Sequence, residues 1–215
     1  MRNQAGLPVL VLVTLICVGR SADCQGSVNE ASMPVVTLRV INEGGIDPAV
    51  LRSGGKEAVR IFRRSGIRLS WIECSQEVEG AKNDPCHRDL GPSEFWLRIV
   101  TRRPTATTQE MLGFSELDED RQTGSAGIYY PGAQALSARS LAGISEILGS
   151  IAAHEVGHLL LGAKAHSSSG VMVADWSHWE FELLSRRQLI FTRDQSSRLR
   201  ERISSSRAAG AKRDQ

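Results

Sequence analysis

Short runs of alternating hydrophobic and polar positions in the first half of the chain are typical of β-strands. Residues 35–41 are mostly β-branched, and residues 67–71 alternate apolar with polar side chains. Between these runs, Asp47-Pro48 supplies a helix N-cap followed by proline, and Ser65-Gly66 ends that helix. Five strands are expected, at residues 35–41, 67–72, 95–100, around 112–114 and at 127–130, of which the last two are short, bounded by glycines and suited to sheet edges.

The spacing of apolar positions becomes helical from about Leu141 and stays so to Leu161, where Gly162 is placed as a C-cap. A loop is expected from residue 163 to about 176, followed by helical regions at 181–189 and 195–203. The order β-α-β-β-β-α-loop-α predicts an α+β domain, in which a mixed, twisted sheet packs on the 141–161 helix and on a C-terminal helix.

The N-terminus has the pattern of a secretion signal. Arg2 precedes an apolar run at residues 7–18, and the small residues Gly19 and Ser21 follow it. The run is too short for a stable span of the bilayer, so a signal peptide at 1–21 is predicted, with an uncleaved anchor as the alternative. Nothing later in the chain resembles a membrane span. We therefore expect a secreted or periplasmic protein with a flexible N-terminus at 22–33, one folded domain at 34–204 and a disordered basic tail at 205–215.

Charge does not favour a nucleic-acid partner. The chain has 26 basic and 24 acidic residues, and cleavage after Ser21 would remove Arg2 and Arg20, leaving no net charge. From Arg186 onward nine basic residues accompany three acidic ones. We interpret this excess as a solvated helix face followed by the tail.

Cysteine usage fits an oxidising compartment. Cys74 and Cys86 are the natural disulfide pair, because residues 82–85 supply a turn between them, whereas Cys24 would be left over near the N-terminus. No two cysteines have the spacing of a zinc site.

The predicted 141–161 helix carries the chemistry. His154 and His158 lie four residues apart, which places two imidazoles one turn apart on one helical face, as zinc requires. Glu155 lies beside them, where it can take a proton from a water activated by the metal. The sequence therefore predicts a catalytic zinc site with Glu155 as general base.

A catalytic zinc site needs a third protein ligand. His166 is the preferred candidate, because Gly162 lets the chain reverse and return a side chain toward the helix. The competitors are His87, His178, Glu180 and Glu182.

These residues resemble the metzincin clan of zinc peptidases. His154-Glu155-x-x-His158, Gly162, His166 and Met172 correspond to its two helical histidines, helix-ending glycine, third histidine and methionine turn. The chain resembles still more a group of small secreted bacterial proteins with His-Glu-x-Gly-His-Leu-Leu-Leu-Gly, then His-Ser and Gly-x-Met. It departs from the common metzincin pattern, because the glycine and the third histidine follow His158 by four and eight residues rather than three and six.

The resemblance implies a metzincin-like (zincin) fold in which Met172 forms a methionine turn beneath the metal. It also implies an edge strand above the metal that binds substrate by strand addition. Gly127, Ile128, Tyr129 and Tyr130 are the candidates for that strand, and one tyrosine is a candidate to stabilise an oxyanion.

On this basis we expect a secreted, monomeric zinc metallopeptidase whose partner is a protein or peptide substrate. Two alternatives stay open. One is a secreted binding or structural module with a non-catalytic zinc site, and the other is a zinc hydrolase of non-peptide amides.

Overall fold

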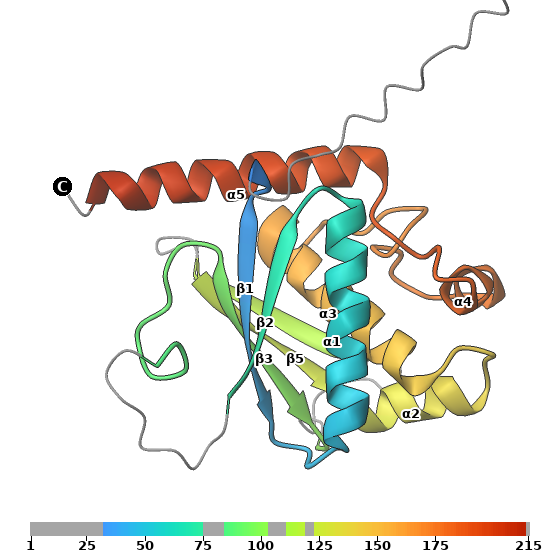
Figure 1. Cartoon of the computed structure of the whole chain (residues 1–215). Coiled ribbons are helices and arrows are strands. Elements are labelled where there is room, and N and C mark those ends of the chain that lie inside the picture. The colour runs from blue at the N-terminus through green and yellow to red at the C-terminus, as the bar shows by residue number, and fades with distance from the viewer. Residues whose placement is uncertain (1–31, 75–83, 103–110, 119–122, 214–215) are drawn as a thin grey trace, which may run out of the picture.

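In the computed structural model, the described residues form a five-stranded mixed sheet and five helices (Figure 1). The structure describes residues 32–74, 84–102, 111–118 and 123–213. The elements are β1 (Val35–Asn42), α1 (Pro48–Arg64), β2 (Arg68–Cys74), β3 (Glu94–Val100), β4 (Gly113–Asp118), β5 (Thr123–Tyr129), α2 (Tyr130–Ala138), α3 (Ile144–Leu161), α4 (His178–Ser185) and α5 (Arg193–Arg213). The expected α+β class with a mixed sheet is confirmed.

The strands lie in the order β2-β1-β3-β5-β4. The pairs β1–β2, β1–β3 and β3–β5 are parallel, and β4 runs antiparallel to β5. Parallel strands need a crossover, and α1 supplies the crossover between β1 and β2. Among the described strands, β2 and β4 therefore form the two edges of the sheet.

One face of the sheet packs on α1 and α3. Val36, Leu38 and Val40 of β1 alternate onto this face and are fully buried. Helix α3 is apolar around most of its circumference because α1, α2, β4, β5 and α5 all contact it. The helix with the histidine pair is thus held on several sides, which makes its side-chain directions rigid.

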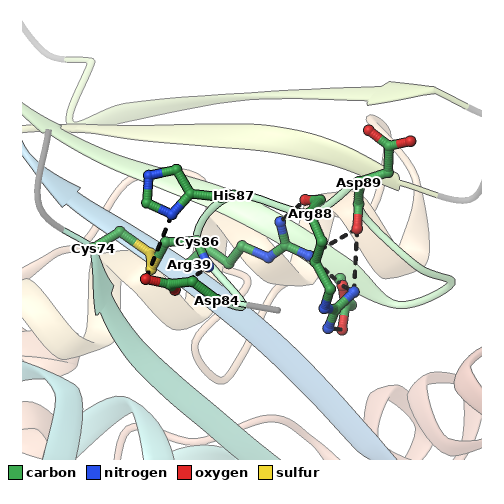
Figure 2. Close-up of a disulfide and its surroundings, with 8 residues drawn as sticks. Arg39, Cys74, Asp84, Cys86, His87, Arg88 and Asp89 are labelled. Carbon is green, nitrogen blue, oxygen red and sulfur yellow. Dashed lines mark hydrogen bonds and ion pairs between the residues drawn. A yellow bond between two sulfur atoms is a disulfide. The ribbon is translucent and has the colours of Figure 1, made fainter. Parts of the chain in front are cut away.

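On the opposite face of the sheet, β1 is in contact with the segment that follows Cys86, which a disulfide attaches to β2 (Figure 2). Cys74 and Cys86 are bonded, with Cα atoms 5.6 Å apart, which confirms the predicted pair. Arg39 of β1 is fully buried beneath this segment and donates to the carbonyl of Asp89 at 2.9 Å and to Glu94 Oε2 at 2.7 Å. The buried guanidinium is therefore paired and hydrogen-bonded, as burial of a charge demands.

Two expectations about strands and helices were wrong. Residues 127–130 do not form an edge strand, because β5 lies between β3 and β4 and ends at Tyr129. Tyr130 instead begins α2, which the pattern did not indicate, with Pro131 in its first turn. The edge beside β5 is β4, which hydrogen-bonds to it in antiparallel register.

The C-terminal region also differs from expectation. Residues 205–213 continue α5 and are not a disordered tail. Alanine is the strongest helix former and basic residues favour a helix C-terminus, so Ala208, Ala209 and the basic residues near the end support this extension. The preceding helix, α4, begins at His178 rather than Phe181, because Ser177 and Glu180 form a capping box.

The predicted signal peptide at 1–21 and nearly all of the expected flexible N-terminus at 22–33 lie outside the described residues. Across the part of the chain that is described, no helix is long and apolar enough to cross a membrane.

Candidate metal centre and cleft

Three histidine side chains converge where α3 ends. His154 and His158 project from one face of α3, and the loop that follows Gly162 returns His166 to them. The Nε2 atom of His158 lies 3.1 Å from Nε2 of His154 and 3.1 Å from Nε2 of His166. Gly162 ends α3 with a φ of 98°, which is the reversal that brings the third histidine back.

Backbone carbonyls orient the two helical rings. Nδ1 of His154 lies 2.8 Å from the carbonyl oxygen of Val171, and Nδ1 of His158 lies 3.3 Å from that of Gly162. A ring whose Nδ1–H donates to a carbonyl presents its Nε2 lone pair on the other side, toward the centre of the cluster.

The surroundings favour the protonation states that a metal needs. Burial lowers the pKa of His154 to about 4, against the smaller opposing effect of the Val171 carbonyl. Burial also lowers the pKa of His158, as does the neighbouring His166. Both rings are therefore neutral near pH 7, and neutral imidazole is the form that binds metals.

Two of the distances in the cluster match those between the ligands of a tetrahedral metal ion. Zinc–nitrogen bonds of about 2.0–2.1 Å at tetrahedral angles place ligand nitrogens about 3.3 Å apart, close to the two observed distances of 3.1 Å. The three candidate ligand atoms all lie within 4.8 Å of one another, and among the described residues they form the one group of three or more able to hold a metal ion. Three nitrogen ligands leave a fourth position open.

Glu155 lies beside this cluster in a nearly closed environment. Its side chain belongs to a residue that is 7% exposed, and burial raises the pKa of Glu155 to about 8. Strand β4 approaches it closely at Gly113, where an added Cβ atom would lie 2.6 Å from Glu155 Oε1. A side chain at position 113 would therefore displace the carboxylate.

Met172 packs against helix α3 at Gly157. It is fully buried, and a Cβ atom added to Gly157 would lie 2.4 Å from its sulfur atom. The same turn supplies the Val171 carbonyl that orients His154. The turn around Met172 thus contacts α3 between the two helical histidines and fixes one of them.

A cleft of about 1220 Å³ opens over the histidines and Glu155. One wall is residues 111–115 of β4 and the segment before it, another is α2, and the floor is α3. Trp176 closes a further side, with its ring centroid 6.5 Å from that of His154. All three candidate ligands line this cleft, so a metal ion held there would be open to the cleft.

The competing third ligands are engaged or placed elsewhere. Glu180 serves the capping box of α4, and Glu182 pairs with Arg186 at 2.6 Å. His87 lies near the disulfide, 3.4 Å from Asp84, as Figure 2 shows. His178, at the start of α4, is not part of the metal-capable group.

The two tyrosines do not reach the cleft. Tyr129 is 1% exposed and packs against Phe114, and neither Tyr129 nor Tyr130 lines the cleft. The placement of the two residues therefore gives no support to the expected oxyanion role. The residues that sequence reasoning missed are Gly113, Arg139 and Trp176, which lie on separate segments and acquire their relation to the histidines only through the fold.

Comparison with known proteins adds little to this picture. No family model matches the chain, and no curated protein sequence matches it. Among solved structures, the chain is similar to metalloproteinase-II from Bacteroides fragilis, with 13% sequence identity and a TM-score of 0.48. The match covers 80% of this chain and 54% of that chain, so the chain spans about half the length of the protein it matches. The function proposed below rests on the residues of the site.

Proposed function

We propose that this chain is a secreted zinc metallopeptidase of metzincin type that hydrolyses peptide bonds. The observation that carries the proposal is the convergence of three histidine Nε2 atoms at an open cleft, with a buried carboxylate beside them that serves as no ligand in the cluster. A purely structural zinc site has four closed protein ligands and no use for a neighbouring free carboxylate. The open side of the cluster therefore favours catalysis over a structural role.

His154, His158 and His166 would hold the zinc ion. Bound zinc lowers the pKa of a coordinated water and polarises the scissile carbonyl. Glu155 accepts a proton from the attacking water and passes it to the leaving amine. A metal ion held by the neighbouring histidines would stabilise the ionised form of this buried carboxylate and lower its pKa.

Substrate would bind along β4. This strand is an edge of the sheet, and residues 111–115 line the cleft beside the histidine helix. Backbone groups at a sheet edge can hydrogen-bond an extended peptide by strand addition. The edge-strand role expected for residues 127–130 thus passes to β4, while a monomeric state and a peptide partner remain part of the proposal.

The test is a cleavage profile of a peptide library, read by mass spectrometry. Glu155→Gln keeps the shape of the side chain and removes the base, so zinc should stay bound while hydrolysis falls by a factor of about 100 to 10,000. Glu146→Gln is the matched control, because it makes the same change on α3 at a residue that does not line the cleft. His158→Ala should lose both metal and activity.

Three outcomes would reject the proposal. Cleavage at full rate in Glu155→Gln would mean a different base or a contaminant. Cleavage that resists a metal chelator would exclude a metallopeptidase. Purified chain that holds zinc tightly but cleaves no peptide in the library, with unchanged partner binding in Glu155→Gln, would indicate the non-catalytic module instead.

A further inference from the structure

The α2 wall of the cleft carries a basic side chain. Arg139 is the C-cap residue of α2 and lines the cleft together with Leu136 of the same helix and Ile151 of α3. Among the described residues that line the cleft it is the one lysine or arginine, and the other charged side chains there are Glu155 and Asp175.

Several arginines of the described residues are held in ion pairs, and Arg139 is not one of them. Arginines at positions 39, 60, 88, 98, 186, 187 and 198 each pair with a carboxylate. Within the described residues, no ion pair engages Arg139, and Asp175 does not come within the 4.0 Å of a salt bridge to it. Arg139 is exposed, has no ion pair with a described residue and lines the cleft that contains the three histidines.

We propose that Arg139 binds a carboxylate of the substrate and so determines the specificity of the cleft; this inference rests on the proposed peptidase function. The guanidinium presents a planar fork of donors that matches a carboxylate with two parallel hydrogen bonds. Peptides offer that group either as an Asp or Glu side chain or as the C-terminal carboxylate. Leu136 and Ile151, which are buried, line the same cleft as Arg139.

A second role for Arg139 has to be separated from this one. A cation at a helix C-terminus interacts favourably with the helix dipole, and that effect needs charge but no fork. Arg139→Lys keeps the charge and removes the bidentate geometry, whereas Arg139→Gln removes both. A helix-end role predicts that lysine behaves as wild type and that no variant changes the choice of peptide.

The experiment measures peptide selection without hydrolysis. Full-length mature chain carrying zinc and the Glu155→Gln change is equilibrated with random hexapeptides, and retained peptides are identified by mass spectrometry. We expect peptides with a carboxylate at one fixed position to be enriched by about tenfold to a hundredfold, the range of a charge-assisted hydrogen bond. Adding Arg139→Gln should abolish the enrichment, Arg139→Lys should reduce it, and Arg139→Glu should turn it toward Lys and Arg. Arg52→Gln, an exposed arginine on α1 outside the cleft, is the matched control and should change nothing.

A parallel library with amidated C-termini identifies the source of the carboxylate. Enrichment that disappears on amidation assigns Arg139 to the C-terminal carboxylate, and enrichment that persists assigns it to an acidic side chain. No enrichment of carboxylates by the Glu155→Gln chain, or equal enrichment after Arg139→Gln, would overturn the proposal.

Cleavage by the chain with Glu155 intact distinguishes this inference from the function beneath it. If the chain cleaves peptides with no acidic preference, the peptidase proposal stands and the role of Arg139 is wrong. If the chain retains acidic peptides through Arg139 but cleaves none, the role of Arg139 in binding stands and the peptidase proposal is wrong. Agreement between both readouts would appear as a loss of kcat/KM in Arg139→Gln for acidic peptides alone, with neutral peptides unaffected.

Discussion

Substitution of Gly113 by alanine tests the contact between the sheet edge and the proposed general base. An added Cβ atom would lie 2.6 Å from Glu155 Oε1 and 2.6 Å from the carbonyl oxygen of Gly127. The backbone of Gly113 does not have a positive φ, so alanine meets no conformational penalty there. Any effect of the substitution therefore comes from lack of space.

The size of the effect follows from these two distances. Ordinary contacts of a Cβ atom begin at 3.4 Å, so both oxygen atoms must recede from the methyl group by about 0.8 Å. The Gly127 oxygen belongs to the neighbouring strand and cannot swing away, so β4 and the Glu155 side chain both have to move. Overpacking of this kind costs about 1–3 kcal/mol of stability. A displacement of about 1 Å at a catalytic group costs roughly 100-fold in rate.

Three measurements on the purified variant separate these effects. We expect a free energy of unfolding in urea lower by about 1–3 kcal/mol, zinc content equal to wild type, and kcat/KM lower by about 100-fold. Zinc should be retained because the methyl group meets the carboxylate and not the histidines. Gly91→Ala is the control, since a Cβ atom there meets Glu94 at no less than 3.6 Å. Unchanged stability together with unchanged kcat/KM in Gly113→Ala would refute the proposed approach of β4 to the base.

Three further outcomes can be measured on the same protein. His158→Ala should lose bound metal in elemental analysis, because Nε2 of His158 lies 3.1 Å from Nε2 of each of the other two candidate ligands. Full retention of the metal would contradict the assignment of His158 as a ligand. Replacing Cys74 and Cys86 by serine should lower the free energy of unfolding by about 3 kcal/mol, as expected for a loop of this length, with unreduced and reduced wild type as references. Burial would raise the pKa of Glu57, but hydrogen bonds from two arginines outweigh it and the pKa lies below 4.5. Its contribution to stability is therefore complete above pH 4.5 and lost as the pH falls through the native pKa. In Glu57→Gln, the free energy of unfolding measured by circular dichroism should fall less steeply as the pH is lowered than it does in wild type. An equally steep fall in both proteins would contradict this.

The parts of the fold that could be predicted from the sequence depend on residues that are close to one another along the chain. The 3.6-residue spacing of α3, the glycine after it and the proline that begins α1 are each decided within one or two helical turns. The His154–His158 pair belongs to this class, because four-residue spacing on a helix already fixes the direction of both rings. The disulfide is also nearly local, with a separation of 12 residues.

Strand order could not be predicted in the same way. Residues 127–129 have a strand pattern whether they lie inside the sheet or at its edge, because alternation reports which face is buried and not which strands are adjacent. The internal position of β5 follows from its parallel pairing with β3, whose residues lie about thirty positions earlier. Helix α2 was missed for a related reason. Tyr129 and Tyr130 are residue types that favour strands, so the sequence indicated a strand through residue 130. In the structure β5 ends at Tyr129, and Pro131 lies in the first turn of α2.

The residues that would bind the metal can be found from the sequence, whereas the residues that would determine substrate specificity cannot. The candidate metal ligands lie on one helix and the loop that follows it, so a sequence pattern suffices to find them. The cleft walls come from β4, α2 and the segment around Trp176, which meet only when the sheet and α3 have packed. A change at Gly113 or Arg139 can therefore alter how substrate is held while leaving the histidine pattern intact. Two chains with the same His-Glu-x-x-His motif would then bind the same metal and select different peptides, and the wall residues are where that difference has to be sought.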